Sequence, residues 1–455
     1  MKIKLIGSSF LLFLFFGLSS LVFGQDNTPE AILTQAAEKL SRREYAQALE
    51  LFDTLPPEYA QDTEIRILRA GIYNSAGKPA EAKKIANEII ASNKNDVNAL
   101  MILADAAMLE NKERERRQFL DRVIAVDNKH ARALIDLANI NLKNQNLRVA
   151  GNYFDRVLAA EPDNGEALVG RASVHRYSKE LKKAEGLLNR AARLYPSWAR
   201  PFQERARLYK SAGFNADALE DFNLALKVEP DNYWVLVDCG QLLMEMNRKQ
   251  DALDHFGRAI KLDPNSFIAY VYSAAIKDEL GDYTGAEKDY ISLTKLKPDY
   301  YFGFEALGII RMRNKQWALA RDSFLDAYKQ APKEFNYAIL AAINWMRAGK
   351  QSDPKQFLSQ VIKTAPRDSL DRAMLSLFHD LKGDADVGIK VEAEKNNYEK
   401  TKMLYFLASY HDIRGNKTIA DRYFLMAKEL NAIGSLEWRL NEIMLNERGI
   451  NIKEK

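Results

Sequence analysis

The tetrapeptide EPDN occurs at residues 161–164 and again at residues 229–232. From the proline of the first copy, a proline recurs at every thirty-fourth residue as far as residue 366. The series is Pro162, Pro196, Pro230, Pro264, Pro298, Pro332 and Pro366. A fixed period of this length is typical of stacked supersecondary units. The length alone suggests about three compact domains, but the period predicts one elongated array.

Other positions of the period explain why such units would stack. Alanine or glycine stands twenty-four residues before each proline, and a Phe, Tyr or Leu stands eight residues before it. Small residues let two helix axes approach to about 8–10 Å, and the bulky residues fill the space between pairs. Each proline ends a helix, and the Asp or Asn after it can cap the next one. The turn inside a pair is marked by Gly77, Gly213, Gly281, Gly349 and Gly415.

With these features the sequence resembles the tetratricopeptide repeat family, as an exported bacterial member. The resemblance implies an all-α fold: a right-handed α-solenoid (superhelix) of about twelve helix-turn-helix units with a C-terminal capping helix. Ten consecutive units would occupy residues 29–366, followed by a degenerate unit at 367–400, a C-terminal unit at 401–432, and the capping helix and tail at 433–455. The C-terminal unit carries Ala408, Gly415, Ala420, Phe424 and Ala427 at the family's positions. It is also similar to repeats of bacterial envelope lipoproteins that dock peptidoglycan-processing enzymes.

Three places depart from the pattern. Arg116 replaces the usual alanine, which predicts looser packing there. Pro354 also replaces that alanine, but after Ser352 and Asp353 it can start a helix. Residues 380–400 keep little of the pattern, so we expect a kink or altered stacking.

The N-terminus reads as a secretory signal peptide, residues 1–24, cleaved before Gln25. The alternative is an uncleaved inner-membrane anchor, since the apolar stretch is nearly long enough to span a bilayer. Both place the rest outside the cytoplasm, and cleavage predicts a periplasmic protein with no membrane insertion. No cysteine follows the apolar stretch, as lipidation would require, and Cys239 is the only cysteine of the chain. Without Lys2 and Lys4, basic and acidic residues nearly balance, so nothing indicates a nucleic-acid partner.

No motif for catalysis, metal binding or a cofactor occurs in the sequence. The five histidines are scattered, and neighbouring carboxylates have the helical spacing of a solvated face. We therefore expect no enzyme activity, no cofactor and no metal. Cys239 falls on the buried side of its helix and is expected to be a core residue.

The family resemblance implies a concave groove lined by positions 2, 5, 9 and 12 of each unit. In the units from 199 to 347 these positions form a basic patch beside an apolar stripe. The candidate partner-binding residues are Arg200, Gln203, Arg207, Lys210, Trp234, Met244, Ile268, Val271, Phe302, Ile309 and Met312. The alternative interpretation is that the apolar members lean onto neighbouring helices and belong to the core.

The sequence thus predicts a non-catalytic scaffold or adaptor of the bacterial cell envelope. Its partners would be other proteins or peptide segments, including envelope or peptidoglycan-processing proteins. Two alternatives stay open: a membrane-tethered assembly factor that keeps its N-terminal anchor, and an envelope enzyme accessory or an unrecognised enzyme.

Overall fold

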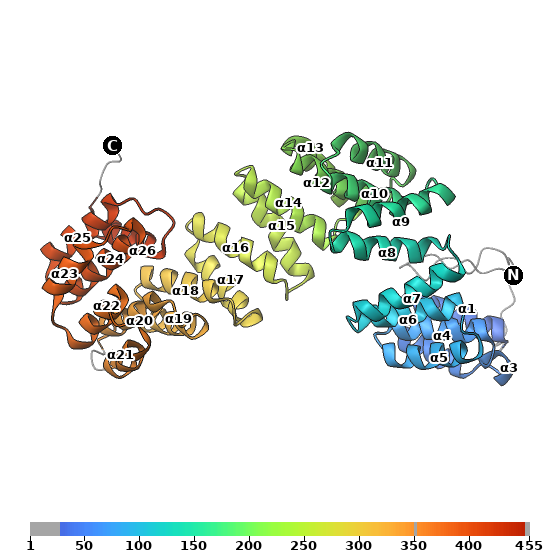
Figure 1. Cartoon of the computed structure of the whole chain (residues 1–455), viewed down its shortest axis with the longest axis horizontal. Coiled ribbons are helices and arrows are strands. Elements are labelled where there is room, and N and C mark those ends of the chain that lie inside the picture. Colours follow the sequence, from blue (N-terminus) through green and yellow to red (C-terminus); the bar gives the residue numbers. More distant parts are fainter. Residues whose placement is uncertain (1–27, 350–352, 451–455) are drawn as a thin grey trace. The chain divides into compact units, whose positions relative to one another are not determined.

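The computed structural model describes residues 28–349 and 353–450, which are helical and contain no strand. These residues form two compact units that meet in the sequence between Pro230 and Asp231, here unit 1 and unit 2. Within each unit consecutive helices pack as antiparallel hairpins, and successive hairpins stack on one another (Figure 1). The expected all-α solenoid of helix-turn-helix repeats is confirmed. The predicted signal peptide lies outside the described residues.

From residue 28 onward, unit 1 contains thirteen helices, α1 to α13. They are α1 (Pro29–Ser41), α2 (Tyr45–Asp53), α3 (Pro57–Ala60), α4 (Thr63–Ser75), α5 (Pro79–Ser92), α6 (Val97–Leu109), α7 (Glu113–Val126), α8 (Ala131–Lys143), α9 (Leu147–Ala160), α10 (Gly165–Tyr177), α11 (Leu181–Leu194), α12 (Ala199–Ser211) and α13 (Asn215–Val228).

Unit 2 contains α14 to α26 in its described residues. They are α14 (Tyr233–Glu245), α15 (Lys249–Leu262), α16 (Phe267–Glu279), α17 (Tyr283–Leu296), α18 (Tyr301–Arg313), α19 (Trp317–Gln330), α20 (Phe335–Arg347), α21 (Asp353–Thr364), α22 (Leu370–Asp380), α23 (Asp384–Ala393), α24 (Asn397–Ile413), α25 (Lys417–Glu429) and α26 (Leu436–Glu447).

The EPDN segments are the joints between hairpins. In both copies the final asparagine is the N-cap of the next helix: Asn164 accepts a hydrogen bond from the amide of Ala167 at 3.0 Å, and Asn232 accepts one from Val235 at 3.2 Å. An N-cap side chain satisfies an amide that has no partner within the helix. The repeated turn therefore starts the first helix of each following unit.

The turn inside each hairpin contains a residue with left-handed backbone geometry, and the turn between α22 and α23 contains two, Leu381 and Gly383. These residues recur every 34 positions and include side chains other than glycine: Arg43, Gly77, Asn111, Gln145, Lys179, Gly213, Asn247, Gly281, Lys315, Gly349 and Gly383. Left-handed geometry suits glycine and costs other residues some energy. The hairpin geometry is thus maintained even where glycine is replaced.

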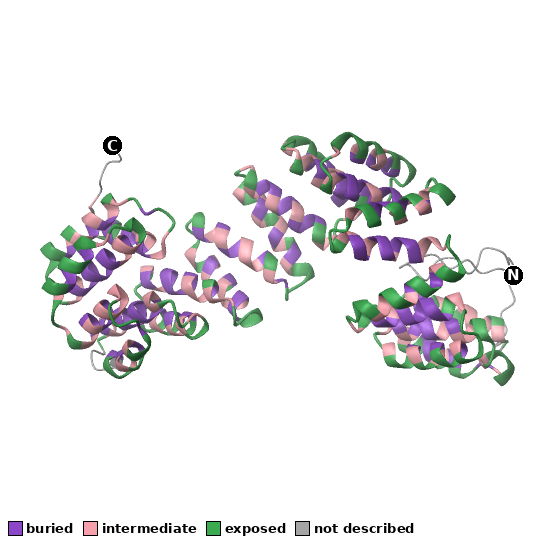
Figure 2. Cartoon of the chain, viewed as in Figure 1, coloured by how far each residue is buried: buried purple, intermediate pink, exposed green. Residues whose placement is uncertain are grey.

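Close packing inside a hairpin depends on the small residue predicted for the first helix. A Cβ atom on Gly240 would lie 2.8 Å from the ring of Phe256, and one on Gly308 would lie 2.5 Å from Phe324. Both phenylalanines are fully buried. Figure 2 shows the same arrangement throughout each unit, with buried residues between the helices and exposed residues along their outer sides.

The places that depart from the repeat keep their helices. Arg116 lies in α7 and pairs with Asp136 at 3.0 Å, and Pro354 is the second residue of α21. The degenerate unit has shorter helices of 11 and 10 residues, α22 and α23. Next to this unit, α24 packs against α20 as well as against α22. No helix among the described residues is long and apolar enough to cross a membrane.

Candidate interaction surface

Three apolar side chains are exposed at the same position of three successive units in unit 2. Trp234, Ile268 and Phe302 are the second residues of α14, α16 and α18. They are 57%, 39% and 49% exposed, although most other apolar residues of these helices are buried. We call these three residues the apolar row. A repeated exposed position of this kind is typical of a surface that binds another molecule.

Neighbouring aromatic rings pack against two members of the apolar row, Trp234 and Phe302. The ring of Trp234 packs edge-on against Tyr233 at 4.9 Å between centroids. Phe302 lies 4.1 Å from the ring of Tyr301 and 5.7 Å from that of Tyr300. Ring contacts of this geometry restrict side-chain motion. The row is therefore a partly ordered surface, which lowers the entropic cost of binding.

The other apolar residues predicted for the groove differ in exposure. Met244 and Val271 are half-buried beside the row. Ile309 and Met312, which the sequence analysis placed on the groove, are only 2% and 4% exposed and belong to the core of unit 2. The core interpretation is therefore correct for these two residues, and they are excluded from the surface proposed below.

Helix α26 contributes to the same core as these two residues. It packs against α24 and α25, as a capping helix does, but its side chains also reach α16 and α20. Leu440, Ile443, Met444 and Leu445 of α26 belong to the same core cluster as Ile309, Met312 and the inner residues of α20. The C-terminal helix thus covers part of the surface that the sequence assigned to a partner.

A sequence model of the tetratricopeptide repeat matches residues 135–197, 204–267 and 237–301. The matched segments run from α8 to the start of α18, and the described hairpins continue the same 34-residue period on either side. This chain contains tetratricopeptide repeats.

Solved structures with a similar fold include YrrB, PilW and a tetratricopeptide repeat protein from Parabacteroides merdae. YrrB is described as having an unusual peptide-binding site; it is 19% identical, with 41% of this chain and 95% of YrrB covered at a TM-score of 0.36. PilW, a type IV pilus biogenesis factor, is 17% identical, with 46% and 98% covered at a TM-score of 0.42. The Parabacteroides merdae protein is 17% identical, with 55% and 98% covered at a TM-score of 0.35. No curated protein matches the sequence significantly.

The basic residues predicted for the groove lie on α12 in unit 1. Arg200 is exposed, Lys210 is half-buried, and Gln203 is 7% exposed. Arg207 pairs with Glu204 at 2.5 Å, so its charge is balanced within its own helix. The basic character of this patch is therefore weaker than the sequence indicates.

Two carboxyl groups lie where α26 meets the side of unit 2 that α16, α18, α20 and α24 form, here called the inner surface. Glu437 is 4% exposed and accepts a hydrogen bond from Asn336 at 3.0 Å. Burial raises its pKa to about 7, and the nearby carboxyl of Glu305 acts in the same direction. Burial also raises the pKa of Glu305, which accepts a hydrogen bond from Tyr337 at 2.5 Å.

Other chemistry-bearing residues have structural surroundings. Cys239 is fully buried in α14, and burial raises the pKa of its thiol to about 12. A thiol with so high a pKa is a poor nucleophile. Among the described residues, no group of three or more His, Cys, Asp or Glu side chains could hold a metal ion.

Sequence reasoning missed the inner residues nearer the C-terminus, Asn336 of α20 and Asp412 of α24. They occupy positions 2 and 12 of their units, the same register that gave the predicted groove residues. Extending that register past residue 335 would have found both. Their partners on α26, Glu437 and Arg448, carry no signal of the repeat.

Proposed function

We propose that this repeat protein is a non-catalytic adaptor of the bacterial cell envelope, exported by its N-terminal signal peptide. It binds an apolar segment of another protein through the apolar row. The exposure of Trp234, Ile268 and Phe302 at one position of three successive units carries the proposal. Tetratricopeptide repeats as a class support protein–protein interaction, and stacked repeats offer extended binding surfaces.

The row suits a partner segment that supplies regularly spaced apolar side chains. Trp is among the residues that dominate binding energy at protein interfaces, and Phe is enriched at them. Removing both large rings should weaken binding by at least about 2 kcal/mol, the usual threshold for such hot-spot residues. Half-buried Met244 and Val271 would lie at the margin of the contact, where truncation costs less.

The test compares two double variants of the full chain in affinity purification from envelope extracts. Trp234→Ala with Phe302→Ala should lose a stoichiometric partner that wild type retains. The control, Ile389→Ala with Tyr398→Ala, removes two side chains of unit 2 that are 68% and 60% exposed but lie outside the row. It should keep the partner. Equal retention by both variants refutes the assignment of the site.

Localisation has a separate test. N-terminal sequencing of the mature protein should find Gln25 as the first residue. A mature chain that begins at Met1 would instead support the membrane-tethered alternative.

A further inference from the structure

Helix α26 lies alongside α20 and runs in the same direction. Near its start, Glu437 accepts the hydrogen bond from Asn336 at the beginning of α20. One to two turns later, the sulfur of Met444 lies 3.8 Å from the guanidinium nitrogens of Arg347 at the end of α20. The helix therefore follows the inner surface of unit 2 as a bound helical segment would.

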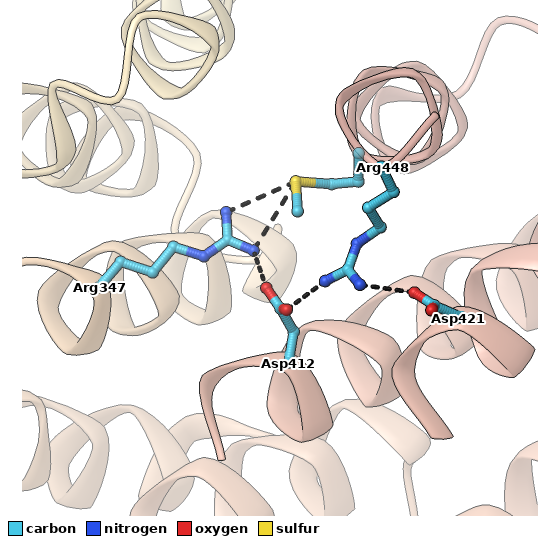
Figure 3. A network of polar contacts seen from close by, with 5 residues as sticks. Arg347, Asp412, Asp421 and Arg448 are labelled. Atoms are coloured by element: carbon cyan, nitrogen blue, oxygen red, sulfur yellow. Dashed lines mark hydrogen bonds and ion pairs between the residues drawn. The ribbon is translucent and has the colours of Figure 1, made fainter. Parts of the chain in front are cut away.

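Two arginines fix the ends of α26 to that surface. Arg439 pairs with Asp278 of α16 at 2.6 Å, although 161 residues separate them. Arg448, just after the helix, pairs with Asp412 of α24 and with Asp421 of α25, the latter at 2.5 Å (Figure 3). Asp412 also accepts a hydrogen bond from Arg347 at 3.3 Å.

Of these carboxylates Asp278 depends most on a cationic partner, whereas Asp412 also has Arg347. Asp278 is 8% exposed, and a buried carboxylate that loses its cation is strongly destabilised. Asp412 and Asp421 lie within reach of a single guanidinium, the geometry that Arg supplies. An occupant of this surface therefore needs arginines about nine residues apart, with apolar residues between them, as in Leu440, Ile443 and Met444 of the chain's own helix.

Several features weaken the packing of α26 against this surface. The segment before α26 has left-handed geometry at Asn431 and Gly434, and Ile433 within it is 59% exposed. Trp438 keeps a buried indole N–H for which the described residues offer no hydrogen-bond acceptor. The carboxyl of Glu437 is buried next to that of Glu305, with Lys402 as the nearby cation. Groups of this kind reduce the stability gained from apolar burial.

We propose that the surface covered by α26 is a second binding site, specific for an amphipathic helix with two arginines about nine residues apart, and that α26 is its internal competitor. We call this surface the α26 seat; it is formed by α16, α18, α20, α24 and α25. A tethered helix acts at an effective concentration of order millimolar. A partner helix must therefore bind tightly enough to displace it. The seat does not include the apolar row, so the two proposals fail independently.

The test uses a labelled peptide of residues 434–450 and the full-length chain, followed by fluorescence anisotropy. Arg439→Glu with Arg448→Glu places two acidic groups against Asp278, Asp412 and Asp421, which should release α26. The peptide should bind this variant with a Kd at least tenfold lower than for wild type, where the seat is occupied. Glu447→Lys, a charge change at an exposed position of α26, should behave as wild type. A peptide with both arginines changed to glutamate should not bind.

The proposal is overturned if the peptide binds the double variant no more tightly than wild type, because α26 would then be a permanent cap. A second measurement covers the case in which the double variant does not fold. Hydrogen exchange of the wild-type chain should show amides of α26 at least tenfold less protected than those of α24. Equal protection of the two helices also overturns the proposal.

Discussion

Replacing Glu437 by Gln should change how stability depends on pH. The carboxyl group is completely buried, and its pKa is raised from 4.5 to about 7. A group that binds its proton more tightly in the folded state stabilises that state in acid. For Glu437 this stabilisation is fully present below pH 4.5 and is lost as the pH rises through about 7. At 1.36 kcal/mol per pKa unit, the whole change is about 3 kcal/mol.

Glutamine keeps the shape of Glu437 and an oxygen that can accept from Asn336, but it does not ionise. Glu437→Gln should therefore have nearly the same stability as wild type at pH 4 and should be more stable by about 2–3 kcal/mol at pH 9. Some pH dependence should persist, since burial also raises the pKa of Glu305 above its ordinary value.

The assay is urea unfolding followed by circular dichroism at pH 4, 6, 7.5 and 9. Long repeat arrays do not always unfold in one step, so the transition of unit 2 is identified first with a core variant of that unit. Glu447→Gln is the matched control, since Glu447 is exposed on the same helix. It should follow wild type at each pH. If wild type and Glu437→Gln lose stability in parallel between pH 6 and 9, the reasoning about this carboxyl group is refuted.

Three further predictions concern packing, capping and thiol chemistry. In thermal melts, Gly308→Ala should lower the stability of the protein by about 1 kcal/mol, because overpacking against Phe324 outweighs the gain in helix propensity. Gly257→Ala, with nothing within 4 Å of its new Cβ, should instead raise the stability by up to about 1 kcal/mol in the same melts. Asn164→Ala should cost about 1 kcal/mol through loss of the N-cap and Asn164→Gly only a few tenths, and equal losses would count against a capping role. Cys239 should not react with a thiol reagent at pH 8 until the chain is unfolded, and rapid labelling of the native protein would contradict its burial.

The repeat fold could be predicted because its determinants are local and periodic. The proline at residue 162 recurs with the unit, the capping Asn164 recurs at Asn232, and the small residue at 308 is opposed by Phe324 within one hairpin. Each of these contacts joins residues of the same or neighbouring helices, so its pattern can be seen in a single sequence. The left-handed residues at positions such as Lys179 were missed, because we looked for glycine and not for the register.

The inner surface could be predicted only in part, since its state depends on contacts far apart in the sequence. Trp234 and Phe302 are exposed because their position on the helix points away from the hairpin. Ile309 and Met312 share the same predicted groove but are buried in a core cluster that also includes residues of α26. The pairing of Arg439 with Asp278 spans 161 residues and has no periodic signal. A single sequence predicts that α26 is a helix but does not indicate which surface it covers.

Site-specific photo-crosslinking in growing cells tests most directly whether the apolar row binds another protein. A photo-reactive amino acid is placed at residue 302 in the apolar row and, as a control, at residue 398 of the same unit, which is at least as exposed (60% against 49%). We predict that residue 302 crosslinks to one discrete protein species and that residue 398 does not. No crosslink at residue 302, or the same products at both positions, would contradict it.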